Sequence, residues 1–210
     1  MYFKDRQDAG RKLAEKLTDL KGKNAAILAL PRGWVPVAYE VAKILQLPLD
    51  TLVVRKLGVI SNPEFAFGAI ADGDVSVVDY SIVRMAFMNA KQVDEIILSE
   101  KEELLRRKNI YKSGSYLWNQ LFDQIILIDD GLATGMTMQA AIEATEKIYH
   151  PKQIIVAVPV AASDSVGLIK RNIHRFITLY QSAVFGTVGQ YYRNFWQTPD
   201  EEVINLIQSQ

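Results

Sequence analysis

The chain has 210 residues, enough to bury one hydrophobic core, so we expect a single domain over residues 1–210. Its 24 basic and 24 acidic residues balance, which excludes a long-range field that would favour nucleic acid or an anionic membrane as partner. With no cysteine there is no disulfide, thiolate nucleophile or Cys-ligated zinc, and we expect a cytoplasmic location.

Helical and strand-like segments alternate along the first quarter of the chain. Residues 4–6 are charged, and no apolar run of the sequence approaches the ~20 residues of a membrane span, so we expect neither a signal peptide nor a membrane anchor. Hydrophobic periodicity predicts an amphipathic helix over residues 5–20, a strand over 25–30, a helix over 35–45 and a second strand over 49–55.

The middle of the chain is predicted as a hairpin and helical insertion over about 72–122. Strands at 67–70 and 75–78 would be joined by residues 72–74, where the central glycine adopts a positive φ at little cost. A long charged helix is predicted over 89–111, with its apolar side packing on the domain or on a second subunit.

The last third of the chain returns to alternating strands and helices. The expected strands are 124–129, 153–160 and 175–179, and the expected helices are 137–148, 163–171 and a C-terminal helix capped by Thr198, Pro199 and Glu201. Such alternation implies βαβ units, so the predicted fold class is α/β, a Rossmann-like and mainly parallel sheet flanked by helices. Residues from about 180 to 210 would form a small C-terminal hood or tail.

One strand end carries the strongest functional signal. A buried apolar run is followed at once by Asp129 and Asp130, and then by a turn containing Gly131, Thr134 and Thr137. In open α/β sheets, ligands bind beyond the carboxyl ends of strands, where helix N-termini present unpaired amides. An acid before a helix is commonly only an N-cap, but two adjacent acids with these hydroxyls favour a phosphate-binding loop.

Two further strand ends are basic. Arg32 and Gly33 follow the first strand, where glycine lets the backbone approach a ligand and the guanidinium can bind two phosphate oxygens at once. Arg55 and Lys56 stand at the exit of the second strand, and the alternative for them is an ordinary solvated strand end. Together these groups would place cations opposite the acidic pair.

The stretch from residue 125 to 137 resembles the motif that binds 5-phosphoribosyl 1-pyrophosphate (PRPP) in type I phosphoribosyltransferases. The positions that match the motif are Asp129, Asp130, Thr134, Gly135 and Thr137. Nearly the whole chain is similar to a bacterial subgroup of these proteins, most clearly at 3–10, 28–37, 53–58, 62–64 and 188–192. Trp34 departs from that subgroup, which usually has a second glycine there.

The resemblance implies a type I phosphoribosyltransferase fold, and a transferase that displaces pyrophosphate from the anomeric carbon of PRPP with a nitrogenous acceptor. The implied 5-phosphate-binding residues are Gly131, Ala133, Thr134, Gly135, Met136 and Thr137, and the implied pyrophosphate-binding residues are Arg32, Gly33, Arg55 and Lys56. The implied catalytic residues are Asp129, Asp130, Lys56 and Arg32. The two acids would accept hydrogen bonds from the ribose 2- and 3-hydroxyls.

The resemblance also implies Mg²⁺ as cofactor, bridging pyrophosphate and ribose oxygens, with Asp129 and Asp130 contacting the ion through water. The expected partners are small molecules, PRPP and an unidentified acceptor such as a nucleobase, in a homodimer of nucleotide metabolism. Residues 58–64 are the expected mobile loop, and the aromatics between Tyr180 and Trp196 form either a hood over a planar base or a cluster packing the tail. The alternative function is a non-catalytic regulator that binds PRPP or a nucleotide.

Overall fold

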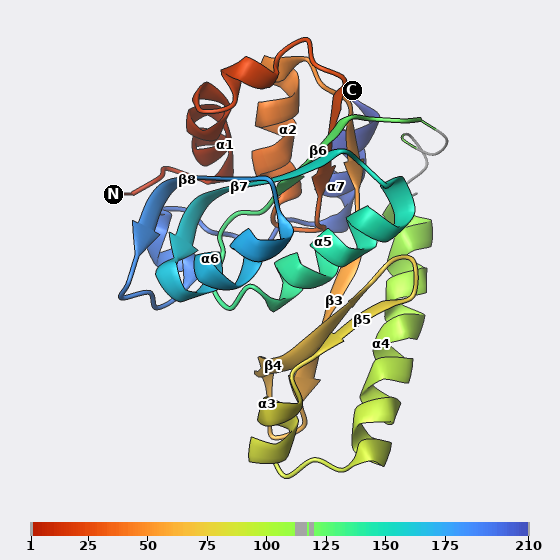
Figure 1. Ribbon diagram of the computed structural model, residues 1–210. Coiled ribbons are helices and arrows are strands. Elements are labelled where there is room, and N and C mark those ends of the chain that lie inside the picture. The colour runs from red at the N-terminus through yellow and green to blue at the C-terminus, as the bar shows by residue number, and fades with distance from the viewer. Residues whose placement is uncertain (1, 112–116, 118–119, 210) are drawn as a thin grey trace.

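The computed structural model describes residues 2–111, 117 and 120–209, and Figure 1 shows a rounded body from which a narrower arm projects. We call residues 54–111 the arm and the remaining described residues the body. Residues 112–116 and 118–119 of the predicted insertion lie outside the described part of the chain.

The body is built on a five-stranded parallel sheet. Its strands lie in the order β2 (Leu49–Thr51), β1 (Ala25–Ala29), β6 (Gln124–Ile128), β7 (Gln153–Ala162) and β8 (Arg175–Ser182). Each neighbouring pair is parallel. The central strands β1 and β6 are buried along almost their whole length, as expected when helices cover both faces of a sheet. This arrangement confirms the predicted fold class.

Helices pack on both faces of this sheet. One face carries α1 (Arg6–Glu15), α2 (Val35–Leu45) and α7 (Asp200–Gln208), and the other carries α5 (Met136–Tyr149) and α6 (Ser163–Ile169). Successive residues of β1 divide between the two cores, with Ile27 in the first and Leu28 in the second. Short 3-10 turns are η1 (Thr18–Leu20), η2 (Lys170–Asn172) and η3 (Val188–Tyr191). The first predicted helix is therefore shorter than expected and ends before η1.

The prediction of one strand over residues 49–55 is wrong in one respect, because these residues form parts of two strands that belong to two sheets. β2 ends at Thr51, and β3 (Val54–Val59) starts a separate antiparallel sheet with β4 (Asn62–Ala71) and β5 (Val75–Val78). Every residue from Leu49 to Val54 is buried. The hydrophobic pattern alone therefore does not show where the chain leaves the main sheet and enters the second sheet.

The second sheet forms the arm together with α3 (Tyr80–Met85) and α4 (Ala90–Tyr111). The helix predicted over 89–111 is confirmed as α4. It begins behind Asn89, which exchanges hydrogen bonds of 2.9 and 3.0 Å with Gln92 in a capping box. Residues 58–64, the expected mobile loop, form the end of β3, a turn and the start of β4.

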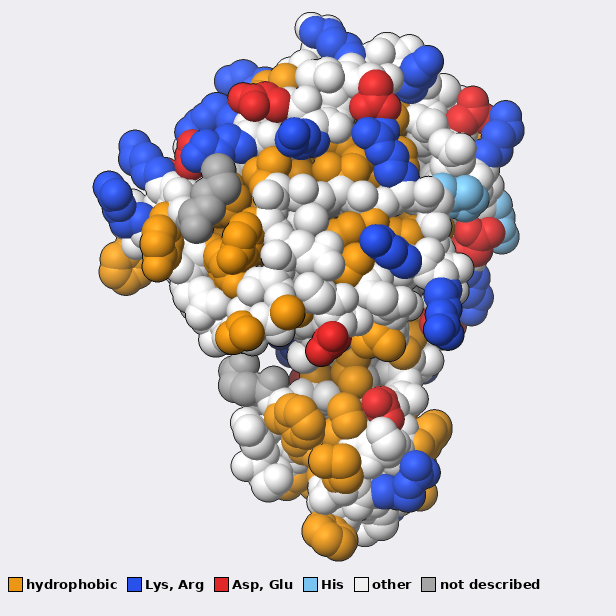
Figure 2. Space-filling model, turned by 60° about the vertical axis from the view of Figure 1, so that its left-hand side comes forward, with side chains coloured by type: hydrophobic (Ala, Val, Ile, Leu, Met, Phe, Trp, Pro, Cys, Tyr) orange, Lys and Arg blue, Asp and Glu red, His pale blue; other side chains and the backbone are white. Residues whose placement is uncertain are grey.

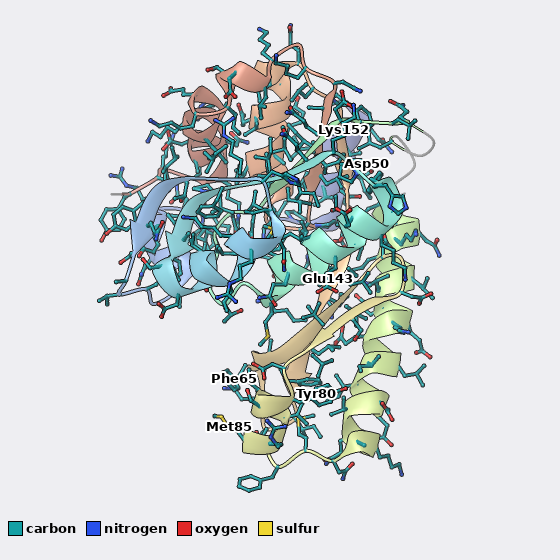
Figure 3. All side chains as sticks on the ribbon, in the orientation of Figure 1. Asp50, Phe65, Tyr80, Met85, Glu143 and Lys152 are labelled. Atoms are coloured by element: carbon teal, nitrogen blue, oxygen red, sulfur yellow. The ribbon has the colours of Figure 1, made fainter. Side chains whose placement is uncertain are left out.

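The far end of the arm is apolar. Phe65, Tyr80 and Met85 lie there, away from the body, and all three side chains are exposed (Figure 3). Figure 2 shows hydrophobic side chains gathered over the arm, whereas charged side chains are spread over the body. Among the described residues no helix combines the length and apolar character needed to cross a bilayer.

Candidate active site

Two carboxylates lie at the carboxyl end of β6. Asp129 and Asp130 directly follow this strand, and they are only 4% and 5% exposed. The Asp129 Oδ1 accepts a hydrogen bond of 3.2 Å from the Gly131 amide. The Asp130 Oδ2 accepts one of 2.8 Å from Arg6 Nε. The acidic pair therefore lies at the sheet edge where ligands of open α/β folds bind.

Burial makes this pair costly to ionise. It raises the pKa of Asp129 well above its ordinary value, and the adjacent charge of Asp130 raises that pKa further. Burial also raises the pKa of Asp130, against the opposing attraction of Arg6 and Lys56. When both acids are ionised, they carry more negative charge than their surroundings neutralise. Such a pair suits a ligand that brings hydroxyl donors or a cation.

Arg6, the first residue of α1, completes this site although it was not among the predicted site residues. Its Nη1 donates a 2.6 Å hydrogen bond to the Trp196 carbonyl, and its guanidinium lies 3.9 Å from the centre of the Phe195 ring. The side chain is 11% exposed. In the sequence, a charged residue that opens an amphipathic helix resembles a solvated one, and its partner Asp130 is 124 positions away.

Gly33 lets the loop after β1 approach the ion pair of Arg6 and Asp130. A Cβ at this position would lie 2.8 Å from Arg6 Nη2 and 2.9 Å from Asp130 Oδ2, closer than such atoms normally come. Any side chain there would displace the guanidinium or the carboxylate. The structure thus brings Gly33, but not its neighbour Arg32, to the acidic pair.

Arg32 has an ion-pair partner outside the acidic pair. Its Nη1 lies 3.6 Å from Oδ1 of Asp200 at the start of α7. Asp200 also accepts a hydrogen bond from Tyr111 at the end of α4, and burial together with this bond raises the pKa of Tyr111 to about 12. The peptide bond between Pro31 and Arg32 is cis. Arg32 therefore links the loop after β1 to α7 and is not directed at the predicted pyrophosphate site.

The turn after the acids encloses a small cavity at the start of α5. Gly135, with a φ of +82°, precedes this helix, and no described side chain caps its first amides. The cavity has a volume of about 110 Å³ and is lined by the acidic pair, Gly131, Leu132, Ala133, Thr134, Gly135 and Thr137, among others. Met136, also predicted here, begins the helix without lining the cavity. Uncapped amides beside hydroxyls are an arrangement that binds phosphate.

Neighbouring segments hold this turn in place. The Ser165 hydroxyl of α6 donates a hydrogen bond to the Ala133 carbonyl. A Cβ at Gly131 would lie 2.6 Å from Val188 Cγ1 and 2.8 Å from Val160 Cγ2, so glycine allows these two valines to pack directly on the turn. Val188 also lines the small cavity, and it brings the C-terminal segment to the site.

The C-terminal aromatics pack as a cluster. Tyr191 and Tyr192 are buried, and the ring centres of Tyr192 and Phe3 are 5.4 Å apart. The Tyr192 hydroxyl donates a 2.5 Å hydrogen bond to the Asp130 carbonyl. The Phe3 amide donates one of 2.8 Å to the Tyr191 carbonyl, which ties the N-terminus to this cluster. These rings therefore pack as a cluster that contacts the acidic pair through the Asp130 backbone, and they do not form an open hood.

A larger cleft of about 700 Å³ opens beside the small cavity and is lined by residues of both the body and the arm. Its walls are the loop after β1, strand β3 and helix α4, and Trp34, Lys56 and Thr137 line both cavities. Arg55 also lines the cleft, where Glu100 of α4 holds its guanidinium at 2.6 Å. Arg55 and Lys56 were expected at the edge of the main sheet. This expectation is wrong, because both residues lie in β3 of the second sheet. Lys56 nevertheless lines the same small cavity as the acidic pair, and its charge acts on Asp130.

A family model described as phosphoribosyl transferase domain matches residues 3–192. Two curated proteins of Mycobacterium tuberculosis, whose names assign them provisionally to the phosphoribosyl transferases, are 43% identical over 205 residues. These matches cover 98% of this chain and 46% of each relative, so the chain spans about half the length of the curated relatives it matches.

Solved structures share the fold. A crystal structure of the protein TT1426 from Thermus thermophilus is 33% identical, has a TM-score of 0.77 and covers 100% of this chain and 99% of that chain. The purine phosphoribosyltransferase from Pyrococcus horikoshii is 15% identical, with a TM-score of 0.51 and coverage of 91% and 88%. The second likeness concerns the fold alone.

Proposed function

Because the chain belongs to the phosphoribosyl transferase domain family, we propose that it transfers the phosphoribosyl group of PRPP to a nitrogenous acceptor. The observation that carries this proposal is the buried acidic pair beside the uncapped start of α5, in one small cavity. Such a cavity offers hydrogen-bond acceptors to sugar hydroxyls and amides to a phosphate. A pentose 5-phosphate carries both kinds of group.

Under this proposal the protein positions the reactants and takes no covalent part. Asp129 and Asp130 accept hydrogen bonds from the ribose 2- and 3-hydroxyls, and the turn from Gly131 to Thr137 surrounds the 5-phosphate. The bond between the anomeric carbon and pyrophosphate breaks while the acceptor nitrogen bonds to the same carbon, so no nucleophilic side chain is needed. Lys56, beside both cavities, stabilises the charge that develops on the departing pyrophosphate.

We also propose Mg²⁺ as cofactor. Two carboxylates whose pKa values are raised by burial fit a cation, and their hard oxygens suit this ion. Within the described part of the chain, no three His, Cys, Asp or Glu side chains form a metal cluster, so water and substrate oxygens would supply the remaining ligands. When bound, the ion would neutralise pyrophosphate oxygens.

The test is pyrophosphate release from PRPP, measured with Mg²⁺ and a panel of purines, pyrimidines and other amines, with and without a chelator. The Asp129→Asn and Asp130→Asn double variant should lose turnover while keeping its circular dichroism spectrum. Asp123→Asn is the control, because Asp123 pairs with Lys152 at 2.7 Å outside the site (Figure 3 labels Lys152). Undiminished turnover in the double variant would show that Asp129 and Asp130 are not part of the active site. Equal rates of pyrophosphate release with and without chelator would show that the reaction does not need Mg²⁺.

A non-catalytic PRPP- or nucleotide-binding regulator is the second candidate. It is favoured by one observation, that Arg32 and Arg55 are already paired with Asp200 and Glu100 and so are not directed at a leaving group. Calorimetry separates the two functions. PRPP binding without pyrophosphate release, for every acceptor in the panel, would support the regulator.

A further inference from the structure

Trp34 lies at the junction of the two cavities, and we propose that its ring is the platform on which the acceptor stacks. The proposal rests on the phosphoribosyl transfer proposed above and adds the class of acceptor. That class is a flat, uncharged heteroaromatic base with N–H donors, bound in the cleft between body and arm.

The position of the cleft favours it as the acceptor site. The acceptor must reach the anomeric carbon of a ribose held by Asp129 and Asp130, so its site must adjoin the small cavity. Trp34, Lys56 and Thr137 line both spaces and make them neighbours. The cleft volume of about 700 Å³ lies in the range of small-molecule sites, and pyrophosphate alone would leave most of it unfilled.

Trp34 is the one aromatic side chain among the described residues that line the cleft. The aromatics of the tail, by contrast, are engaged with one another, since the Tyr191 ring centre lies 5.1 Å from that of Phe185 and 5.4 Å from that of Tyr180. An aromatic face stacks on a flat base whatever its hydrogen-bonding pattern. A planar acceptor in the cleft therefore has Trp34 as its stacking partner.

The Trp34 side chain is anchored on a rigid part of the body. The residue occupies the N-cap position of α2, and its half-buried ring packs against the core on the α5 face of the sheet. A ring held by the core loses little conformational freedom when a ligand covers its remaining surface. Trp34 is thus preorganised for stacking.

The wall that α4 contributes to the cleft favours an uncharged ligand that donates hydrogen bonds. Glu95 and Ser99 lie about one turn apart on this helix and line the cleft with oxygen acceptors. Arg55 and Arg107 on the same cleft are already paired with glutamates of α4, at 2.6 and 2.7 Å, and the charge of Lys56 acts on Asp130. The carboxylate of a charged heterocycle would compete with these acids for the three cations, whereas ring N–H and amino groups would find acceptors.

Fluorescence of Trp34 tests the stacking directly. The chain has three tryptophans, so Trp118→Phe combined with Trp196→Phe leaves Trp34 as the sole emitter. Trp118 lies outside the described residues, and Trp196 is 82% exposed. In the presence of ribose 5-phosphate, adenine, guanine, hypoxanthine and uracil are titrated, and we expect at least one to quench Trp34 emission saturably. The carboxylated pyrimidine orotate should quench at concentrations at least tenfold higher. Failure of all four bases to quench saturably overturns the proposal, and tighter binding of orotate overturns the assigned class.

Two substitutions separate stacking from core packing. Trp34→Phe keeps an aromatic face, whereas Trp34→Leu keeps an apolar side chain without one. For the base that quenches, calorimetry should give a Kd raised roughly 5- to 150-fold by Trp34→Leu and changed little by Trp34→Phe. Equal base affinities in Trp34→Leu and wild type, with both proteins melting cooperatively, overturn the stacking role. PRPP affinity should fall less than base affinity in Trp34→Leu, because the ring also lines the small cavity, and equal falls in the two affinities would overturn the stacking role. A wild type that does not bind PRPP would instead refute the proposed function.

Discussion

The Nε of Arg6 lies 2.8 Å from the Oδ2 of Asp130, so a residue of the first helix partly neutralises an acidic pair that follows β6. The contact spans 124 positions of the sequence and is mostly buried. Arg6 also donates to the Trp196 carbonyl, which brings the tail into the same network. The candidate site thus depends on three segments that are far apart in the chain.

Removing Arg6 should destabilise the fold. Arg6→Gln leaves the buried Asp130 without its ion-pair partner, and we expect the free energy of unfolding in urea to fall by about 3 kcal/mol. Arg11→Gln is the matched control, because Arg11 pairs with Glu40 at 3.4 Å and its side chain is 48% exposed. Its expected cost is below about 1 kcal/mol. Equal losses in the two variants would contradict a special contribution from the buried pair.

Asp129 should make the protein less stable as the pH rises. Burial and the neighbouring Asp130 raise the pKa of Asp129, so the folded state holds this proton more tightly than the unfolded chain does. The free energy of unfolding then falls as pH rises through the folded-state pKa. Asp129→Asn keeps an oxygen that can accept from the Gly131 amide and removes this loss. We expect the variant to be more stable than wild type at neutral pH, with the advantage vanishing below about 4, the ordinary aspartate pKa.

Asp123→Asn provides a control of opposite sign for that pH series. The hydrogen bond and charge of Lys152 lower the pKa of Asp123, so its contribution to stability is present above the ordinary pKa and is lost as pH falls. This variant should be less stable than wild type at neutral pH and equal to it in acid. Urea unfolding at a series of pH values measures both variants. The same sign in both would contradict the burial argument for Asp129.

Gly131 should tolerate no side chain. In Gly131→Ala the new Cβ would meet Val188 and Val160 at 2.6 and 2.8 Å, and we expect a loss of about 1–3 kcal/mol in unfolding free energy together with weaker binding of ribose 5-phosphate. Gly167→Ala is the control, because that Cβ would meet no described atom within 4 Å and Gly167 lies in α6. The control should gain about 0.5–1 kcal/mol. Unchanged ribose 5-phosphate affinity in Gly131→Ala would contradict the proposal that this turn binds the 5-phosphate.

Arg32 is the residue whose observed position and expected role differ most. If it swings to bind pyrophosphate, Arg32→Gln should weaken pyrophosphate binding in calorimetry by roughly tenfold, the value of a charge-assisted hydrogen bond. Asp200→Asn removes the anion that now lies 3.6 Å from it, and should tighten binding at low salt. Arg175→Gln, whose partner Asp19 lies 2.6 Å away at the surface, controls for the loss of one positive charge. Identical affinities in Arg32→Gln and wild type would exclude Arg32 from the site.

The body was largely predictable from the sequence because parallel strands covered on both faces are continuous apolar runs. Residues 124–128 show this most clearly, and the acids that follow them lie at the carboxyl edge as expected. α4 was predictable from the apolar periodicity of residues 89–111. Each of these features is local, since the residues that determine it are adjacent in the chain.

The features that escaped prediction depend on pairing between distant segments. Burial does not mark the change from the main sheet to the arm, because every residue from Leu49 to Val54 is buried, including the polar Asp50 and Thr51. Arg6 and Arg32 look alike in sequence, as cations near a helix start. Their partners, Asp130 and Asp200, are set by the tertiary fold alone.

The hydrogen bond between the Phe3 amide and the Tyr191 carbonyl has a consequence for biosynthesis. Phe3 docks onto a segment almost 190 positions further along the chain, and Arg6 donates to the Trp196 carbonyl as well as to Asp130. A nascent polypeptide on the ribosome would therefore expose an unfinished pocket until the segment around Trp196 has emerged. Long-range contacts of this kind slow folding, and we expect sugar phosphate binding to arise only after the segment around Trp196 has docked on Arg6.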